Sequence, residues 1–213
     1  MLTKDEKTLP LDEIVPEYHS SFFLVRNFFR DRIKYALAFA PIDDKKKIMD
    51  LGCGSGLLLQ EIRKINGKCK LVGVDFNINL KNLKVENCEL KEDDATKLSF
   101  KDNSFDIVFA LDSLEHIKNV DDAIKQLRRV LKPNGTFIIT GPTENFFYKF
   151  GRFLLKGTFS EKEGPGTGVH YHTIRTLDKD LIKHGFVKKK EMNLPQYLPG
   201  IIIEKVISYT NKK

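Results

Sequence analysis

KIMDLGCGSG, residues 47–56, joins a short apolar run to three alternating glycines, and a helical pattern, LLLQEI, follows at residues 57–62. The glycines Gly52, Gly54 and Gly56 lack a Cβ, so the backbone there can turn sharply and approach a ligand closely. The stretch therefore predicts a strand, a tight turn and a helix, which together form a cradle of the kind that holds nucleotides.

The spacing of these glycines argues against a dinucleotide. A dinucleotide site uses G-x-G-x-x-G and places a pyrophosphate at a helix N-terminus. This chain has G-x-G-x-G instead, with Asp50 two residues before the first glycine. A carboxylate beside a pyrophosphate is unfavourable, but beside a cationic ligand it is stabilising. The turn therefore favours a positively charged nucleoside over NAD.

A second apolar run ends in a carboxylate. Residues 71–75 read LVGVD, so Asp75 closes a predicted buried strand. It follows the glycine turn by about twenty residues, the offset of an acid that accepts both ribose hydroxyls. The ring of Phe76, the next residue, could lie against the adenine. A helix N-cap is the alternative for Asp75, and a core position is the alternative for Phe76.

The glycine turn resembles the first motif of the class I S-adenosylmethionine-dependent methyltransferases, as DLGCGSG at residues 50–56. This resemblance implies that the turn, with Cys53 inside it, holds the methionine part of the cofactor S-adenosyl-L-methionine. It also implies that Asp50 organises the turn or contacts the ammonium group through water. The resemblance covers residues 47–143 well and the remainder only in outline.

Two further segments extend the resemblance. Asp94-Ala95 resembles the family's Asp-Ala pair, in which the carboxylate accepts the adenine amino group and the alanine N–H meets a ring nitrogen. A register slip of one residue would give that role to Asp93, and a solvated acidic turn is the alternative. Leu111, which we count with the cofactor-binding residues, begins LDSLEHI. That segment, residues 111–117, resembles one at the mouth of the site in many small-molecule methyltransferases.

Five strand signals alternate with helical patterns. Residues 103–110 indicate a central strand that is apolar on both faces, and residues 127–135 indicate a helix end and a turn before a fifth strand at 136–140. This order predicts right-handed crossovers and an α/β, doubly wound parallel sheet. The resemblance implies a Rossmann-like, mostly parallel sheet of seven strands, with an N-terminal helix and a helical lid after strand five.

Length and composition indicate one domain. We expect residues 1–213 to form a single methyltransferase domain, with an N-terminal helical cap (1–46), a cofactor-binding core (47–144) and a substrate-side part with a lid (145–213). No apolar stretch reaches about 18 residues, and no charged-then-apolar leader is present. The three cysteines lack C-x-x-C spacing, which favours a reducing compartment. We expect a cytoplasmic protein, and peripheral contact with a membrane stays open.

The positive charge lies in one part of the chain. Residues 1–144 hold 23 basic and 23 acidic residues, whereas residues 145–213 hold 13 basic and 6 acidic ones, which accounts for the net charge of +7. A basic face can attract nucleic acid, an anionic small molecule or an anionic membrane. A solvated lysine surface is the alternative.

The segment after the fifth strand has an aromatic face. Residues 145–156 place aromatic side chains at helical spacing on one side and basic ones toward another. We infer a lid whose inner face, including Phe147 and Phe150, covers an apolar acceptor, with residues 161–168 as its hinge loop. Its basic rim could touch an anionic membrane surface. An amphipathic helix packed on the sheet is the alternative.

Another aromatic helix is predicted at residues 18–40. In related enzymes a helix placed here closes the cofactor site, and Tyr18 resembles the aromatic residue that reaches into it. Most of its apolar positions indicate core packing.

Three histidines are candidates for the rim of the acceptor pocket. His116, His170 or His172 could remove a proton from the acceptor, because imidazole titrates near neutral pH. We also count His116 and His170 among the substrate-contacting residues, and a plain hydrogen-bonding role for all three stays open. The His-x-His spacing at 170–172 has no acidic or cysteine partner nearby in the sequence, so we expect no metal.

The motifs together predict S-adenosylmethionine-dependent methyl transfer to a small, partly apolar acceptor, either a metabolite or a lipid or quinone precursor. The chain has ALDS at residues 110–113, where enzymes that methylate exocyclic amines of DNA or RNA bases carry Asn-Pro-Pro-Tyr or Asp-Pro-Pro-Tyr, so a nucleic-acid partner is disfavoured. A non-catalytic protein that binds S-adenosylmethionine or a metabolite, and an RNA or protein methyltransferase, are the alternatives. The acceptor, the methylated atom and the oligomeric state stay open.

Overall fold

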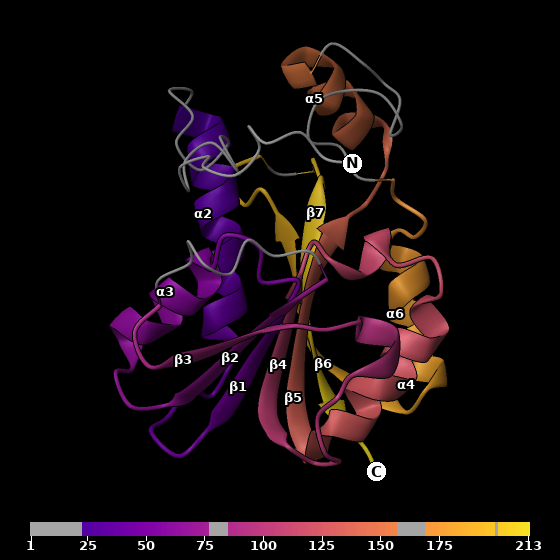
Figure 1. Cartoon of the computed structure of the whole chain (residues 1–213). Coiled ribbons are helices and arrows are strands. Elements are labelled where there is room, and N and C mark those ends of the chain that lie inside the picture. The colour runs from indigo at the N-terminus through magenta and orange to yellow at the C-terminus, as the bar shows by residue number, and fades with distance from the viewer. Residues whose placement is uncertain (1–22, 77–84, 157–168, 199) are drawn as a thin grey trace, which may run out of the picture.

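The computed structural model describes residues 23–76, 85–156, 169–198 and 200–213. A seven-stranded sheet forms its centre, with helices on both faces (Figure 1). The strands are β1 (Lys47–Leu51), β2 (Lys70–Asp75), β3 (Cys88–Glu92), β4 (Phe105–Leu111), β5 (Leu131–Pro142), β6 (Phe186–Leu194) and β7 (Glu204–Asn211). The α-helices are α2 (Phe23–Ala38), α3 (Leu57–Ile65), α4 (Val120–Val130), α5 (Phe146–Lys156) and α6 (Ile174–Lys183).

The strands lie in the order β3-β2-β1-β4-β5-β7-β6. The first five of these are parallel to one another, and β7 runs antiparallel to both β5 and β6. The chain leaves β1 toward β2 and β3 on one side, and then toward β4 and β5 on the other. This reversal creates a switch point between β1 and β4, where ligands bind in doubly wound sheets. The predicted mostly parallel, seven-stranded α/β fold is confirmed.

The sheet separates two apolar cores. Ile48 packs with residues of α2 and α3, whereas the next residue, Met49, packs with residues of α4 and α6. The same alternation holds along β4, where Ile107 and Val108 belong to opposite cores. Successive side chains of a strand point to opposite faces, so a strand that is covered on both sides must be apolar throughout. None of the helices in the described residues combines the length and apolar composition that a bilayer crossing requires.

Two predicted boundaries differ from the observed ones. The fifth strand was expected at 136–140, but β5 begins at Leu131, directly after α4 ends at Val130. The turn residues fall inside the early part of the strand, where Asn134 has a φ of 60° and the pairing with β4 is irregular. The predicted helix at 18–40 is seen as α2, and its first residues lie outside the described part, as does the predicted hinge loop at 161–168.

Gly73 lets the glycine turn and α3 pack closely onto β2. A Cβ at this position would lie 2.7 Å from Leu59 Cδ1, 2.8 Å from Leu90 Cδ2 and 3.0 Å from Cys53 Sγ. The contacts come from α3, β3 and the turn, so any side chain at Gly73 would push three segments apart. Burial raises the pKa of the Cys53 thiol, which therefore stays protonated and acts as a packing group.

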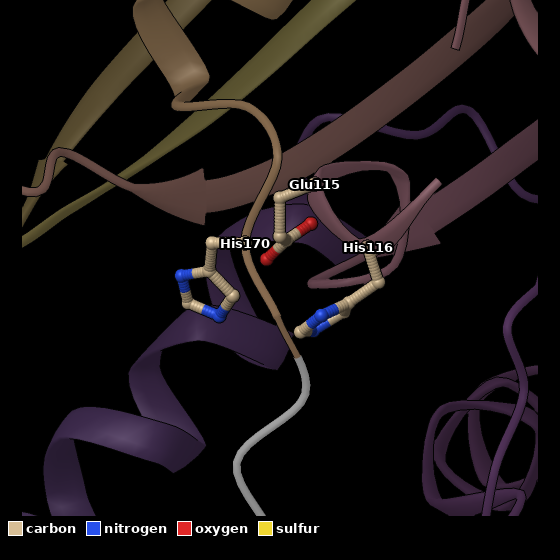
Figure 2. Close-up of side chains that lie close together, drawn as sticks. All are labelled: Glu115, His116 and His170. Atoms are coloured by element: carbon tan, nitrogen blue, oxygen red, sulfur yellow. The ribbon is translucent and has the colours of Figure 1, made fainter. Parts of the chain in front are cut away.

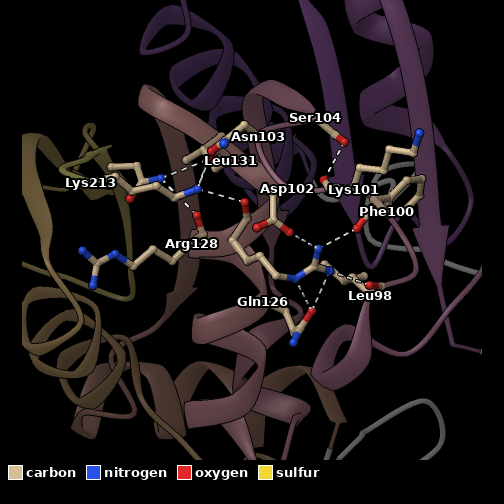
Figure 3. A network of polar contacts seen from close by, with 12 residues as sticks. Leu98, Phe100, Lys101, Asp102, Asn103, Ser104, Gln126, Arg128, Leu131 and Lys213 are labelled. Carbon is tan, nitrogen blue, oxygen red and sulfur yellow. Dashed lines mark hydrogen bonds and ion pairs between the residues drawn. The ribbon is translucent and has the colours of Figure 1, made fainter.

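Arg129, near the end of α4, holds the segment that follows β3 in place. Its guanidinium donates to the carbonyl oxygens of Leu98 and Phe100 at 2.6 and 2.7 Å and to the Asp102 carboxylate at 2.8 Å (Figure 3). The C-terminal residue joins the same network, because the Lys213 ammonium donates to the carbonyl oxygens of Arg129 and Leu131. The segment is thus tied to α4 through the backbone oxygens of Leu98 and Phe100, and to Lys213 through the side chain of Asn103.

Arg129→Lys should destabilise the protein although it keeps the charge. A lysine ammonium cannot reproduce the forked geometry with which the guanidinium contacts several acceptors at once. We expect a loss of about 1–3 kcal/mol in the free energy of unfolding, measured by urea titration. The control is Arg175→Lys, an exposed position on α6, which should change stability by less than about 0.5 kcal/mol. Equal losses in the two variants would contradict the role given to Arg129.

Candidate active site

The glycine turn is built onto the end of β2. Its three glycines have left-handed φ angles, 78° at Gly52, 44° at Gly54 and 71° at Gly56, a region that favours glycine. The Gly52 and Cys53 N–H groups both donate to the Val74 carbonyl oxygen, at 2.7 and 3.0 Å. The backbone conformation predicted for the turn is therefore present, and main-chain hydrogen bonds hold it against the neighbouring strand.

Gly52 also allows β4 to approach the turn. A Cβ at Gly52 would lie 2.4 Å from the Ser113 Cβ, a distance that real atoms do not reach. The Ser113 hydroxyl uses this closeness to donate to the Leu51 carbonyl oxygen at 2.9 Å. The ends of β1, β2 and β4 thus meet at one point of the sheet edge.

The three predicted carboxylates follow three adjacent strands. Asp50 lies in β1, Asp75 ends β2, and Asp94 comes directly after β3. Hydrogen bonds connect them through the backbone, since Gly54 N–H donates to the Asp75 carboxylate at 2.9 Å and Asp93 N–H donates to the Asp75 carbonyl oxygen at 3.0 Å. Because β1, β2 and β3 are parallel, the three acids lie along the same edge of the sheet.

Asp50 is buried and electrostatically coupled to Asp75. Its burial, together with the negative charge of Asp75, raises the pKa of Asp50 from 3.8 to about 7. At neutral pH the carboxyl group therefore exchanges between its neutral and ionised forms. A cation bound beside it would favour the ionised form.

Asp94 and Asp93 are both engaged with their own segment. The Asp94 carboxylate accepts from the Thr96 N–H and hydroxyl, each at 2.8 Å, and these hydrogen bonds lower the pKa of Asp94. Asp93 accepts from the Ser99 N–H at 3.0 Å. Asp94 thereby caps the short 3₁₀ turn η3 (Ala95–Lys97), and Ala95 is the first residue of this turn. The pair lies next to Asp75 and is held rigidly.

The other cofactor candidates lie at the same edge or outside the described residues. Phe76 follows β2 and its side chain is 74% exposed, so in this structure the ring does not belong to the core. Leu111 ends β4 and is half-buried. Tyr18 lies outside the residues that the structure describes.

A buried ionic network next to β4 was missed by the sequence analysis. Arg32 of α2 forms ion pairs with Asp112, directly after β4, and with Glu204 at the start of β7, the latter at 3.9 Å. The Thr140 hydroxyl of β5 donates to the Asp112 carboxylate at 2.7 Å. The network joins α2 to three strand ends. A sequence signal for it was the helical spacing of Arg32, four residues before Ala36, which places the arginine on the buried face of α2.

The structure brings together two of the three candidate histidines. The rings of His116 and His170 lie 4.8 Å apart, centre to centre, in an edge-to-face arrangement (Figure 2). His116 Nδ1 lies 3.2 Å from the Val169 carbonyl oxygen, and His170 Nδ1 lies 2.6 Å from a carboxylate oxygen of Glu144. His172 is half-buried, and its Nε2 has no hydrogen-bond partner among the described residues.

Glu115 lies between these two rings and was not singled out from the sequence. It is 1% exposed, and burial, together with its acidic neighbours, raises the pKa of Glu115 to about 8. Its carbonyl oxygen accepts from the Tyr171 N–H at 2.8 Å, which binds the histidine-bearing loop to the end of β4. Glu115 is part of the LEHI segment at residues 114–117, but only the histidine of that segment was predicted to be functional.

Helix α5 follows β5, as predicted. Its aromatic residues are largely exposed, with Phe146 at 71% and Phe150 at 44%, and these two rings stack 6.0 Å apart. Phe147 is also exposed, whereas the ring of Tyr148 lies 6.5 Å from that of His170. The helix is anchored at its base, because Asn145 and Thr143 donate to the carbonyl oxygens of residues 202–203.

Comparison with known proteins gives the family. A family model described as a methyltransferase domain matches residues 24–190, which is most of the chain. The chain belongs to the methyltransferases. The predicted family is therefore confirmed.

Curated relatives of this methyltransferase include enzymes named for quinone and sterol acceptors. The demethylmenaquinone methyltransferase of Staphylococcus epidermidis is 31% identical over 169 residues, which cover 70% of this chain and 69% of that protein. The sterol 4-C-methyltransferase strm-1 of Caenorhabditis elegans is 36% identical over 100 residues, which cover 43% of this chain but only 29% of that protein. The similarity to the quinone enzyme is thus the more extensive of the two.

Solved structures of low sequence identity share the fold. A putative S-adenosylmethionine-dependent methyltransferase from Listeria monocytogenes has a TM-score of 0.66 at 17% identity and covers 87% of this chain and 100% of its own. An S-adenosylmethionine-dependent methyltransferase from Mesorhizobium loti has a TM-score of 0.67 at 19% identity, covering 83% and 96%. Family and fold together identify an S-adenosylmethionine-dependent methyltransferase, and the predicted cofactor, S-adenosyl-L-methionine, is confirmed.

Asp50→Asn should flatten the pH dependence of stability. Because the pKa of Asp50 is raised from 3.8 to about 7 in the folded state, its stabilising contribution is full below the unfolded-state pKa. That contribution is lost as the pH rises through about 7. Wild-type stability should therefore fall relative to the variant across this window, by at most about 4 kcal/mol. Urea unfolding at a series of pH values measures the difference.

The matched control is Glu89→Gln, at an exposed acid of β3, which should keep the wild-type pH dependence. If wild type and Asp50→Asn lose stability in parallel as the pH rises, Asp50 does not hold a proton in the native state.

Proposed function

We propose that this methyltransferase transfers the methyl group of S-adenosylmethionine to a small, partly apolar acceptor of the quinone or lipid-precursor class. The observation that carries this proposal is the extensive match to demethylmenaquinone methyltransferases, which covers 69% of one from Staphylococcus epidermidis and 83% of one from Chlorobaculum parvum. Exposed aromatic side chains on α5 support it, because they offer apolar contacts beside the strand ends. We further propose that residues 1–213 act as one domain, with residues 1–46 as its N-terminal cap.

The cofactor would lie along the edge formed by β1, β2 and β3. The glycine turn would hold the methionine part, with Cys53 packed beneath it, and Asp50 would face the positive charge. Asp75 would accept the ribose hydroxyls, and Phe76 would cover the adenine. The remaining proposed contacts to the cofactor are those of Asp94, Ala95, Leu111 and Tyr18.

The cofactor supplies an electrophilic methyl carbon on its sulfonium, and the chain aligns the acceptor with it and excludes water. We place the acceptor beside the histidine pair, where Phe147 and Phe150 could fold over it. His116 and His170 each anchor Nδ1 on an oxygen, so in the neutral imidazoles the lone pairs lie on Nε2. Such a lone pair can accept a proton from the acceptor or bind a cation. His172 stays a third candidate base.

Asp75→Asn should weaken S-adenosylmethionine binding about 10–100-fold, because one acceptor oxygen is replaced by a donor at the ribose site. Isothermal titration measures the loss. The control is Asp121→Asn, an exposed acid of α4 outside the site, which should bind normally. Unchanged affinity in Asp75→Asn would remove the ribose assignment.

Transfer of labelled methyl groups tests the activity itself. Wild type incubated with methyl-labelled cofactor and an extract should label an organic-soluble product, and Asp75→Asn should lose that labelling. Label that disappears on nuclease or protease treatment would instead indicate an RNA or protein acceptor. Bound cofactor with no labelled product at all would favour a binding protein without catalysis.

We also propose that α5 contacts an anionic membrane surface, which would make the protein a peripheral one in the cytoplasm. The stacked rings of Phe146 and Phe150 are exposed, and Lys149 between them is exposed as well. Aromatic rings at the headgroup level and nearby basic side chains are the usual elements of such contacts. The basic excess of residues 145–213 adds long-range attraction.

Replacement of both Phe146 and Phe150 by Ser should reduce cosedimentation with vesicles of anionic lipid at low salt at least fivefold, because the inserted apolar surface is lost. The control is Tyr197→Ser, an exposed aromatic residue outside α5, which should leave cosedimentation unchanged. Equal recovery of wild type and the double variant would rule out contact through α5.

A further inference from the structure

Three side chains with metal-binding atoms converge at the end of β4. One ligand atom each from Glu115, His116 and His170 lies within 4.8 Å of the others. Figure 2 shows the Glu115 carboxylate between the two imidazole rings. Glu115 and His116 belong to the short 3₁₀ turn η4 (Leu114–His116), and His170 comes from the segment between α5 and α6. Residues distant in sequence thus meet at one point.

The hydrogen bonds of the two histidines favour metal binding. A carbonyl oxygen can only accept, so His116 Nδ1, next to the Val169 oxygen, carries the proton. The Glu144 carboxylate likewise accepts from His170 Nδ1. In the neutral form of each imidazole, the lone pair then lies on Nε2. Histidines that bind metals show this arrangement, in which an outer oxygen sets the tautomer and orients the ring.

The third donor has a carboxylate oxygen without a partner. Glu115 is 1% exposed, and its Oε2 has no hydrogen-bond partner in the part of the chain that the structure describes. Leaving such an atom buried is unfavourable unless a ligand satisfies it. Two further acids, Glu144 and Glu204, act electrostatically on Glu115 against one guanidinium, that of Arg32. An added positive charge would therefore be stabilised here.

We propose that Glu115, His116 and His170 bind a divalent transition-metal ion of the zinc class. Two imidazoles and one carboxylate are a common donor set for such ions, and three protein ligands leave further positions open. His116 is exposed, which gives the ion a path from solvent. This site differs from the His170-x-His172 pair considered from the sequence, because the partners come from η4.

The observed separations need only a small adjustment. Ligand atoms at about 2.1 Å from a tetrahedral zinc ion lie about 3.4 Å from one another. His170 stands in a segment that is neither helix nor strand, so its ring can approach the other two donors without moving the sheet. An open position on the ion would bind an oxygen of the acceptor. This last step rests on the proposed function, whereas metal binding itself does not.

Zinc binding to the full chain, measured without cofactor or acceptor, tests the site directly. Competition with a chelator should give one zinc ion per chain, and Glu115→Gln, His116→Gln and His170→Gln should each weaken it at least tenfold. Substitution by Co²⁺ should produce visible absorption bands that change in each variant. Glu144→Gln should weaken binding less, because Glu144 only orients His170.

The matched control is His172→Gln, which removes a histidine from the same loop but from outside the cluster, and should leave zinc affinity unchanged. Titration with S-adenosylmethionine shows whether each variant is folded. No stoichiometric zinc in wild type, or affinity in a folded variant equal to that of wild type, would overturn the proposal. Because the metal assay needs no methyl transfer, its failure is distinct from failure of the proposed function.

Discussion

The absence of a side chain at Gly52 is the constraint on which the site depends. At this residue the end of β1 turns left-handed, donates to β2 through the Val74 carbonyl oxygen, and lies against Ser113 after β4. A Cβ at Gly52 would clash with the Ser113 Cβ, at 2.4 Å. Three strand ends can therefore meet only because this residue and Gly73, deeper in β2, leave space. The contact that closes the core is therefore the same one that shapes the glycine turn.

Charge at the edge is divided between two regions. On the side of β1, β2 and β3, Asp50 and Asp75 are close enough that the negative charge of Asp75 helps to raise the pKa of Asp50. This arrangement suits a cationic nucleoside, because a positive charge offsets the repulsion between the two carboxylates. On the side of β4, β5 and β7, Arg32 already compensates Asp112 and Glu204. The first region can accept a positively charged ligand. In the second region, the ion pairs hold α2 against the strand ends.

Most of the fold could be predicted from sequence because its signals are local. The apolar runs at residues 47–51 and 105–111, and the glycines that follow the first of them, are short patterns that indicate strands and a turn without reference to distant residues. The misplaced start of β5 has a physical reason, since Pro133 and Gly135 are turn residues that the strand accommodates at an irregular pairing. Arg32 and Glu115 were missed because their roles arise from partners far away in sequence. Burial of a charged side chain is a tertiary property and leaves no local pattern.

The anchoring of α5 has a consequence for how the protein is made. The residues at the base of this helix, Thr143 and Asn145, donate to carbonyl oxygens at positions 202–203, between β6 and β7. Strand β7 then pairs with β5 from Pro142 back to Thr136. On the ribosome, strands β1 to β4 can assemble early. The hydrogen bonds at the base of α5 cannot form until residues 202–203 and β7 have emerged. The part of the sheet edge that carries α5 is therefore completed only after β7 has been synthesised, later than the edge formed by β1, β2 and β3.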